Sequence, residues 1–119
     1  ARGVSESFWV VTGTTMSGGV SDDVKLAAQS TATVIVLMGL NKLNEITEIF
    51  SSCGKQNTPV AVIQNGTLSS QQAVIGNISS IVDLVQQEKI GAPAIIVIGE
   101  VVKYARDLQK VVAEQVRNL

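Results

Sequence analysis

Two turns that each follow an apolar run are the first candidates for chemistry in this sequence. Met38–Gly39 ends the run VIVLMG, and Asn65–Gly66 ends the run VAVIQNG. Methionine is an unusual residue at the end of a buried strand, and glycine has no side chain to pack there. Glycine lets another group approach the backbone closely, and a flexible thioether fits irregular surfaces. These features leave two interpretations. Either the backbone at the two turns is kept free of side chains so that a ligand can lie against it, or both are ordinary turns and Met38 is a core residue.

Histidine is absent from all 119 residues. Its absence removes the commonest general base, the commonest metal ligand and every Ser-His or Cys-His nucleophile pair. Cys53 is the only cysteine, which excludes an internal disulfide. Because Cys53 stands before Gly54 at a predicted helix end, we expect a packed thiol, not a reactive one. The sequence therefore disfavours hydrolase and zinc-site functions.

The glycine-rich stretch GTTMSGGV invites comparison with a phosphate-binding loop, because Gly13 and Gly18 have the Walker spacing. The position of the motif's lysine holds Gly19, and that of its Ser/Thr holds Val20. Without the cation and the magnesium-binding hydroxyl, this loop cannot act as a phosphate loop. Four isolated carboxylates lie on predicted helix surfaces, where a solvated role is far commoner than catalysis: Glu45, Glu48, Asp83 and Glu88.

The overall composition excludes several classes of function. The chain is 45% hydrophobic and 16% charged, which is typical of one compact domain. A net charge of -1 with scattered Lys and Arg gives no electrostatic footprint for nucleic acid, and only 3% of residues are aromatic. Apolar runs are much shorter than the roughly 20 residues that span a bilayer. With no signal-peptide pattern, we expect a cytoplasmic protein.

Apolar periodicity predicts one α/β domain with a mixed, roughly five-stranded sheet flanked by helices. The apolar runs TVIVLM and AIIVIG lack polar alternation, as expected of strands covered on both faces. Predicted strands cover roughly 7–12, 33–38, 60–64, 71–76 and 94–99. Predicted helices cover roughly 20–29, 40–53 with Asn41 as N-cap and Gly54 just past the end, 78–85, and 101 to the end. In the last of these, one side carries Val102, Ala105, Leu108, Val112 and Leu119.

The order of these elements places the two glycine turns in comparable positions. The stretch VAVIQNGTLSSQQAVIG is typical of a hairpin with a broad loop, which makes the sheet mixed. In open α/β sheets, ligands bind at the carboxyl ends of strands. Since Met38–Gly39 and Asn65–Gly66 both stand at such ends, we expect any ligand to lie there.

Four segments follow one another in an order and at a spacing that resemble a known family. They are VVTGTT, VIVLMGLNKLNEI, NTPVAVIQNGT with Gln72 shortly after, and PAIIVIGEVV. Each is weak alone, but four in register over roughly residues 2–102 are similar to the C-terminal half of the tetrapyrrole methylases, especially of its uroporphyrinogen-III branch. One departure is Ala73, because a basic residue commonly follows this glutamine in the family.

The resemblance implies a role for the two turns. In the family, the methionine of the Met-Gly motif and the glycine of the Asn-Gly-Thr motif contact S-adenosyl-L-methionine, and these positions match Met38 and Gly66. Ala61 matches a position that tends to lie along the adenosine. An adenine ring needs an apolar lining and free backbone groups, which such turns offer. Arg2–Gly3 resembles the end of a family stretch whose arginine lies near the acidic macrocycle, so Arg2 is the candidate substrate-binding residue.

The resemblance also implies an activity and its partners. Such enzymes transfer methyl groups from S-adenosyl-L-methionine to ring carbons of uroporphyrinogen III. They yield S-adenosyl-L-homocysteine and precorrin-2, which leads to siroheme and cobalamin, and the step needs no metal. The expected partners are the tetrapyrrole, an N-terminal half of the same protein and a second copy in a homodimer, with no nucleic acid and no membrane.

The family's catalytic residues belong to its N-terminal half, whose Gly-Pro-Gly-Asp and Gly-Gly-Asp motifs do not occur here. We therefore expect residues 1–119 to be the C-terminal α/β domain of a tetrapyrrole methylase. It would hold half of a cofactor cleft, contain no catalytic residue and be inactive alone. Two alternatives remain open: a methylase of the same fold acting on another precorrin, and a non-catalytic module for small-molecule binding or dimerisation.

Overall fold

The computed structural model describes residues 7–65 and 71–117, in which five strands form one sheet. Runs of valine and isoleucine explain most of these strands, because β-branched residues pack well on a pleated surface. The strands are β1 (Phe8–Thr12), β2 (Thr33–Leu37), β3 (Pro59–Gln64), β4 (Gln72–Asn77) and β5 (Ala94–Ile98). Across the sheet their order is β1-β2-β5-β3-β4, which confirms the predicted mixed, five-stranded architecture.

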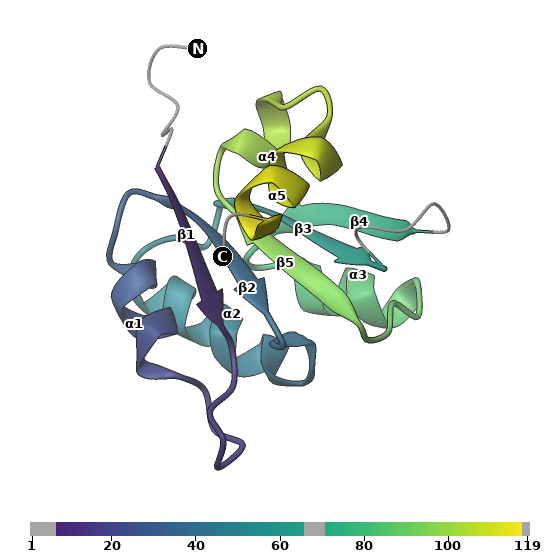
Figure 1. Cartoon of the computed structure of the whole chain (residues 1–119). Coiled ribbons are helices and arrows are strands. Elements are labelled where there is room, and N and C mark those ends of the chain that lie inside the picture. Colours follow the sequence, from purple (N-terminus) through teal and green to yellow (C-terminus); the bar gives the residue numbers. More distant parts are fainter. Residues whose placement is uncertain (1–6, 66–70, 118–119) are drawn as a thin grey trace.

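Helices cover both faces of the sheet (Figure 1). The first face carries α1 (Asp22–Ala28), the 3₁₀ turn η1 (Leu40–Lys42), α2 (Leu43–Ser52) and α3 (Ile81–Gln87). The second face carries α4 (Val101–Tyr104) and α5 (Leu108–Arg117). None of the helices in the described residues combines the length and apolar character needed to cross a bilayer.

Strand directions bring three strand ends to one edge of the sheet. β1 runs parallel to β2, whereas β5 is antiparallel to both β2 and β3. β1, β2 and β3 therefore point the same way, and their carboxyl ends lie together. Leu37 and Ile63, near the ends of β2 and β3, both pair with Ile95 between them. β3 and β4 form the predicted hairpin.

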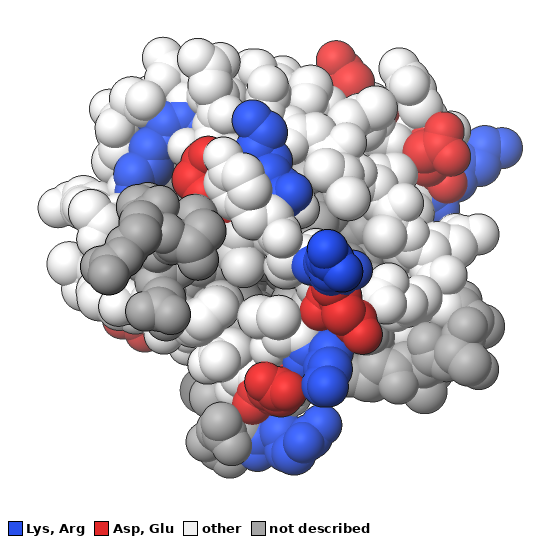
Figure 2. Space-filling model, turned by 90° about the horizontal axis from the view of Figure 1, so that it is seen from above, with Lys and Arg blue, Asp and Glu red and all other residues white. Residues whose placement is uncertain are grey.

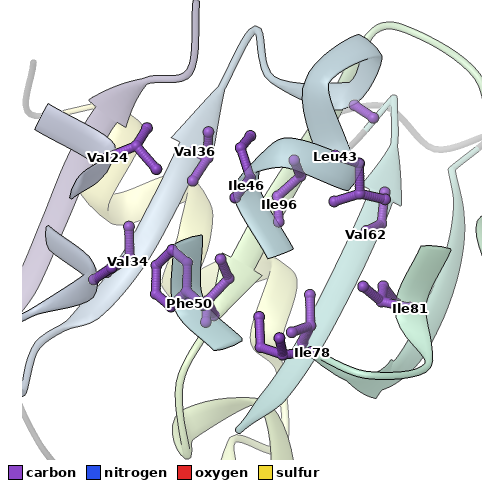
Figure 3. Close-up of a cluster of buried hydrophobic side chains, with 14 of the residues drawn as sticks. Val24, Val34, Val36, Leu43, Ile46, Phe50, Val62, Ile78, Ile81 and Ile96 are labelled. Atoms are coloured by element: carbon purple, nitrogen blue, oxygen red, sulfur yellow. The ribbon is translucent and has the colours of Figure 1, made fainter. Parts of the chain in front are cut away.

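The main core lies between the first face and helices α1, α2 and α3 (Figure 3). The predicted stripe of α2 is confirmed, because Leu43, Ile46 and Phe50 are all buried. Phe50, 1% exposed, is the largest of the fully buried side chains. Figure 3 shows it among aliphatic side chains of the sheet and of α2. This packing holds α2, and with it the Met38–Gly39 turn, against the sheet.

A smaller core covers the second face. Its fully buried sheet residues include Ile35, Ala61 and Val97, which pack with Val102 of α4 and Val112 of α5. Side chains nearer the strand ends on this face are less covered, since Leu37 and Ile95 are only half-buried. The two short helices thus leave apolar surface accessible at the carboxyl end of β2 and at the adjoining start of β5.

The predicted helix from residue 101 onward is interrupted, which corrects the sequence-based expectation. Ala105 leaves the helical conformation with ψ 125°, and α5 begins at Leu108. The Asp107 carboxylate accepts a hydrogen bond from the Lys110 backbone N–H at 3.1 Å, the arrangement of an N-cap. Val102 before the break and Val112 after it both pack against the second face of the sheet. The apolar spacing of the sequence therefore continues across the break and does not reveal it. Leu119 lies outside the described residues.

The end of α2 corrects a second expectation. Cys53 is exposed and not packed, because α2 ends at Ser52 and its buried stripe stops at Phe50. Gly54 has a φ of +78°, so it is the left-handed residue after the helix, as predicted. Asn41 does not cap α2, because it lies within η1 and Lys42 occupies the N-cap position.

Candidate functional site

The residues directly after β2 and β3 share an uncommon backbone conformation. Met38 has a φ of +55° and Asn65 a φ of +54°, both in the left-handed region. Asparagine tolerates this region, whereas methionine there carries strain, which tends to persist at functional sites. The Met38 side chain is 69% exposed, so it is not the core methionine of the alternative interpretation. Two strand spacings, or roughly 10 Å, separate these two turns along one edge.

Gly39 is explained by internal packing. Its φ of -124° is open to any residue, but an added Cβ would lie 2.8 Å from Val36 Cγ1 and 3.0 Å from Ile46 Cδ1. Gly13, after β1, is equally confined, since its Cβ would lie 2.7 Å from the Gly39 Cα. The two glycines let the first two strand ends touch. Residues of the same domain, not a ligand, therefore pack against Gly39. The accessible residue of this turn is Met38.

Hydrogen bonds hold the Met38 turn to the loop after β1. The Gly13 backbone N–H donates to the Leu37 carbonyl at 2.6 Å. The Thr14 hydroxyl donates to the Met38 carbonyl at 3.1 Å. These two bonds fix the peptide groups on both sides of the Met38 nitrogen and Cα, and so support its left-handed conformation. Thr14 belongs to the VVTGTT segment that resembles the family, but the sequence could not reveal its role, because that role depends on a partner 24 residues away.

We expect Thr14→Val to destabilise the domain by about 0.5–1.5 kcal/mol, because it removes one partly exposed hydrogen bond at constant shape. Thr14→Ser keeps the hydroxyl and should retain most of the stability. Urea unfolding followed by circular dichroism measures the difference. Thr12→Val is the matched control, since no described residue bonds the Thr12 hydroxyl. Equal losses for Thr14→Val and Thr12→Val would contradict a specific role of the Met38 contact.

An apolar row crosses the second face at the same edge, one residue before Met38 and two residues before Asn65. Residues paired across neighbouring strands point to the same face of a sheet. Beside Thr12 of β1, the register therefore aligns four apolar side chains, here named the edge row: Leu37, Ile95, Ile63 and Ala73. Leu37 and Ile95 are half-buried, Ile63 is 1% exposed and Ala73 is exposed. Together with the Met38 thioether, the edge row offers an uncharged, apolar surface.

Ala61 lies two residues deeper on the same face, with no exposed surface. It lines a hollow of about 200 Å³ that also includes Ile63 and Ala73 of the edge row. The other walls come from Ile75, Val102 and residues 105–109 between and within the last two helices. Ala61 therefore lines the same hollow as two residues of the edge row. Met38 does not line this hollow. Gly66 and Arg2 lie outside the described residues.

Charge is distributed in small mixed groups and not in one patch. Figure 2 shows Lys and Arg interleaved with Asp and Glu on the face seen from above Figure 1. The ion pairs Lys25–Asp22 and Lys42–Glu45, at 3.6 and 3.5 Å, are surface contacts on helices. Among the described residues, no three His, Cys, Asp or Glu side chains gather as a metal site requires. An uncharged ligand group therefore suits the edge row better than a phosphate or a metal.

Sequence comparisons identify relatives of this chain, although no protein-family model matches it. A siroheme synthase of Psychrobacter arcticus is 32% identical over 108 residues, which are 90% of this chain and 20% of that protein. A uroporphyrinogen-III C-methyltransferase of Methanocaldococcus jannaschii is 34% identical over 103 residues, 85% of this chain and 43% of that protein. The chain therefore spans less than half the length of both relatives.

Solved structures agree with these relatives. The native uroporphyrin III C-methyl transferase of Thermus thermophilus shares the fold over 87% of this chain and 44% of its own, with a TM-score of 0.74 and 23% identity. A crystal structure of the same enzyme with S-adenyl homocysteine gives a TM-score of 0.73. Over most of its length this chain is therefore homologous to one part of the uroporphyrinogen-III C-methyltransferases and siroheme synthases, and it belongs to the tetrapyrrole methylase family.

Proposed function

We propose that residues 1–119 are the C-terminal domain of an S-adenosyl-L-methionine-dependent uroporphyrinogen-III C-methyltransferase. The domain supplies one wall of the cofactor cleft, and a preceding N-terminal half supplies the other wall and the catalytic residues. The observation that carries this proposal is the 34% identity to the Methanocaldococcus jannaschii enzyme over 85% of the chain. The shared carboxyl edge, with its exposed Met38, supports it from the geometry.

Within this domain, the adenosyl group lies against the edge row. Met38 packs its thioether on the adenine, Ala61 lines the inner end of the cleft, and Gly66 gives the ligand access to the backbone. When bound, S-adenosyl-L-methionine supplies the methyl group and leaves as S-adenosyl-L-homocysteine. The apolar side chains contribute by excluding water and by fixing the cofactor's orientation toward the nucleophilic carbon. Their uncharged character fits adenine, because no ionisable residue stands in the described strand ends.

The substrate is uroporphyrinogen III and the product precorrin-2. A macrocycle that carries eight carboxylates requires cationic partners, and Arg2 is the candidate that this domain offers. The remaining contacts and the acid or base chemistry belong to the N-terminal half. The fold alone also suits a methylase that acts on another precorrin, since a cobalt precorrin-4 methyltransferase matches with a TM-score of 0.74 at 15% identity.

Binding of S-adenosylhomocysteine tests the divided cleft. We expect isothermal calorimetry to detect weak or no binding to the 119-residue chain, because half of the wall is absent. The protein extended by the residues that its gene encodes before Ala1 should bind with micromolar or better affinity. Submicromolar affinity of the 119-residue chain alone would show a self-sufficient pocket and contradict the proposal.

Methyl transfer tests the substrate. The extended protein should convert uroporphyrinogen III to a product with two added methyl groups, each replacing a hydrogen, which mass spectrometry measures, while the 119-residue chain gives none. Later precorrins serve as competing substrates. Transfer to one of them but not to uroporphyrinogen III would assign another precorrin methylase, and no transfer with full cofactor binding would assign a binding module.

A further inference from the structure

The segment that leads from α3 into β5 lies on the surface of the domain (Figure 1). Ile90 and Ala94 are buried, with 8% and 9% of their surface exposed. Ala92 and Pro93, which lie between them, are exposed. Packing therefore does not fix the path by which the chain enters β5. This path matters for the candidate site, because β5 contributes Ile95 to the edge row.

The backbone ladder gives this segment little support. On one side, β2 pairs with β5 only as far as Leu37 and Ile95, where β2 ends. On the other side, the Asn65 N–H donates to the Pro93 carbonyl at 2.9 Å. A hydrogen-bonded pair in an antiparallel ladder normally exchanges two bonds, but proline has no N–H to return. Within the described residues, one backbone bond therefore ties Pro93 to the sheet.

The Gln64 side chain supplies a second link between β3 and this segment. Its carboxamide oxygen, Oε1, accepts a hydrogen bond from the Gly91 backbone N–H at 2.9 Å. Gln64 is half-buried and is the last residue of β3, directly before Asn65. Gln64 and Asn65 thus hold the two ends of residues 91–93, one through its side chain and the other through its backbone. The partners of the side-chain bond are 27 residues apart, so no sequence pattern indicates it.

The Gln64 side chain lies on the opposite face of the sheet from the edge row. Successive side chains of a strand point to opposite faces, and Ile63 belongs to the edge row on the second face. Gln64 therefore shares the first face with Val62, on the side that α3 covers. Any effect of Gln64 on the edge row passes through the backbone from Gly91 to Ile95, and not through contact with a ligand there.

We propose that Gln64 is a positioning residue for the cofactor. By holding the Gly91 N–H, it sets the direction in which the chain enters β5, and with it the place of Ile95 beside Leu37 in the edge row. The inference rests on the proposed function, in which the edge row carries the adenosyl group. A wall that is ordered before the ligand arrives binds it more tightly, because ordering the wall on binding costs affinity.

Amide hydrogen exchange tests the link itself. Gln64→Met keeps the length of the side chain and removes the strong acceptor, whereas Gln64→Glu keeps an oxygen for the Gly91 N–H. In the cofactor-free extended protein, Gln64→Met should speed exchange of the Gly91 amide hydrogen about tenfold, as NMR measures. Gln64→Glu should preserve the protection. Gln87→Met, at an exposed position on α3, is the matched control and should leave the rate unchanged. An unchanged rate in Gln64→Met would overturn the proposal.

Cofactor binding tests the consequence. In the extended protein, calorimetry should give an affinity for S-adenosylhomocysteine about tenfold lower in Gln64→Met and nearly unchanged in Gln64→Glu and Gln87→Met. The KM for S-adenosyl-L-methionine should rise by a similar factor with kcat unchanged, because Gln64 acts on binding and not on the reacting atoms. Equal losses of affinity in Gln64→Met and Gln64→Glu would contradict a role of the acceptor oxygen.

The two proposals fail in different ways. If the extended protein without substitutions did not bind S-adenosylhomocysteine, the proposed function would be wrong, and the positioning role with it. If that protein bound the ligand and Gln64→Met bound it equally well, only the role of Gln64 would be wrong. A loss of stability in Gln64→Met without a loss of affinity would show a purely structural hydrogen bond and likewise overturn this inference alone.

Discussion

Phe50→Ala is expected to lower the free energy of unfolding by about 3–5 kcal/mol, the largest stability loss expected of any substitution considered for this domain. The ring is 1% exposed and lies in the core between α2 and the first face of the sheet. The neighbouring strands and helices are held by their own backbone hydrogen bonds, so they cannot move in to fill the cavity that the ring leaves. The substitution therefore loses both the transfer free energy of the ring and the contacts around the cavity.

Chemical denaturation of the 119-residue chain measures this loss. Leu26→Ala is the matched control, because Leu26 is 57% exposed on α1 and should change the stability by less than about 0.5 kcal/mol. The Lys55 ammonium, 5.8 Å from the ring centre, adds a weak cation–π contact that the substitution also removes. Comparable losses for Phe50→Ala and Leu26→Ala would mean that the core does not lie where α2 meets the sheet.

Sequence periodicity was sufficient to predict the strands and the buried stripe of α2. β2 and β5 carry uninterrupted apolar runs that only a sheet covered on both faces accommodates, and both faces are covered. The same reasoning failed at Ala105–Asp107. Side chains before and after the break bury the same face, so the apolar spacing continues while the backbone does not. Asp107 as N-cap was the available signal for a new helix.

The candidate site was only partly predictable. The Met38 and Asn65 turns could be placed at one edge because strand ends are marked by the end of an apolar run. The edge row could not, because its four side chains come from four strands and meet only through the register. The bond from Thr14 to the Met38 carbonyl likewise joins distant segments. For Gly39, the sequence left open which group it admits, and the structure identifies the side chains of Val36 and Ile46.

Met38→Gly is expected to weaken cofactor binding without lowering the stability of the domain. A left-handed conformation costs an ordinary residue about 1–2 kcal/mol, and glycine avoids this cost. The greater freedom of glycine in the unfolded chain offsets about 0.5–1 kcal/mol. The free energy of unfolding should therefore stay level or rise by up to about 1.5 kcal/mol. An exposed thioether contributes little packing to lose, since Met38 is 69% exposed.

The same substitution removes the side chain that the proposed function places on the adenine. In the protein extended before Ala1, we expect the affinity for S-adenosylhomocysteine to fall about tenfold, which corresponds to about 1.4 kcal/mol. Leu26→Gly would lower stability without touching the site, so it separates the two effects. A strained backbone conformation at an exposed methionine does not help the domain to fold. Strain of this kind persists mainly where function requires it, which favours a functional role for Met38. If the affinity were unchanged and the stability raised, Met38 would not contact the cofactor. Its left-handed conformation would then have no explanation in the proposed function.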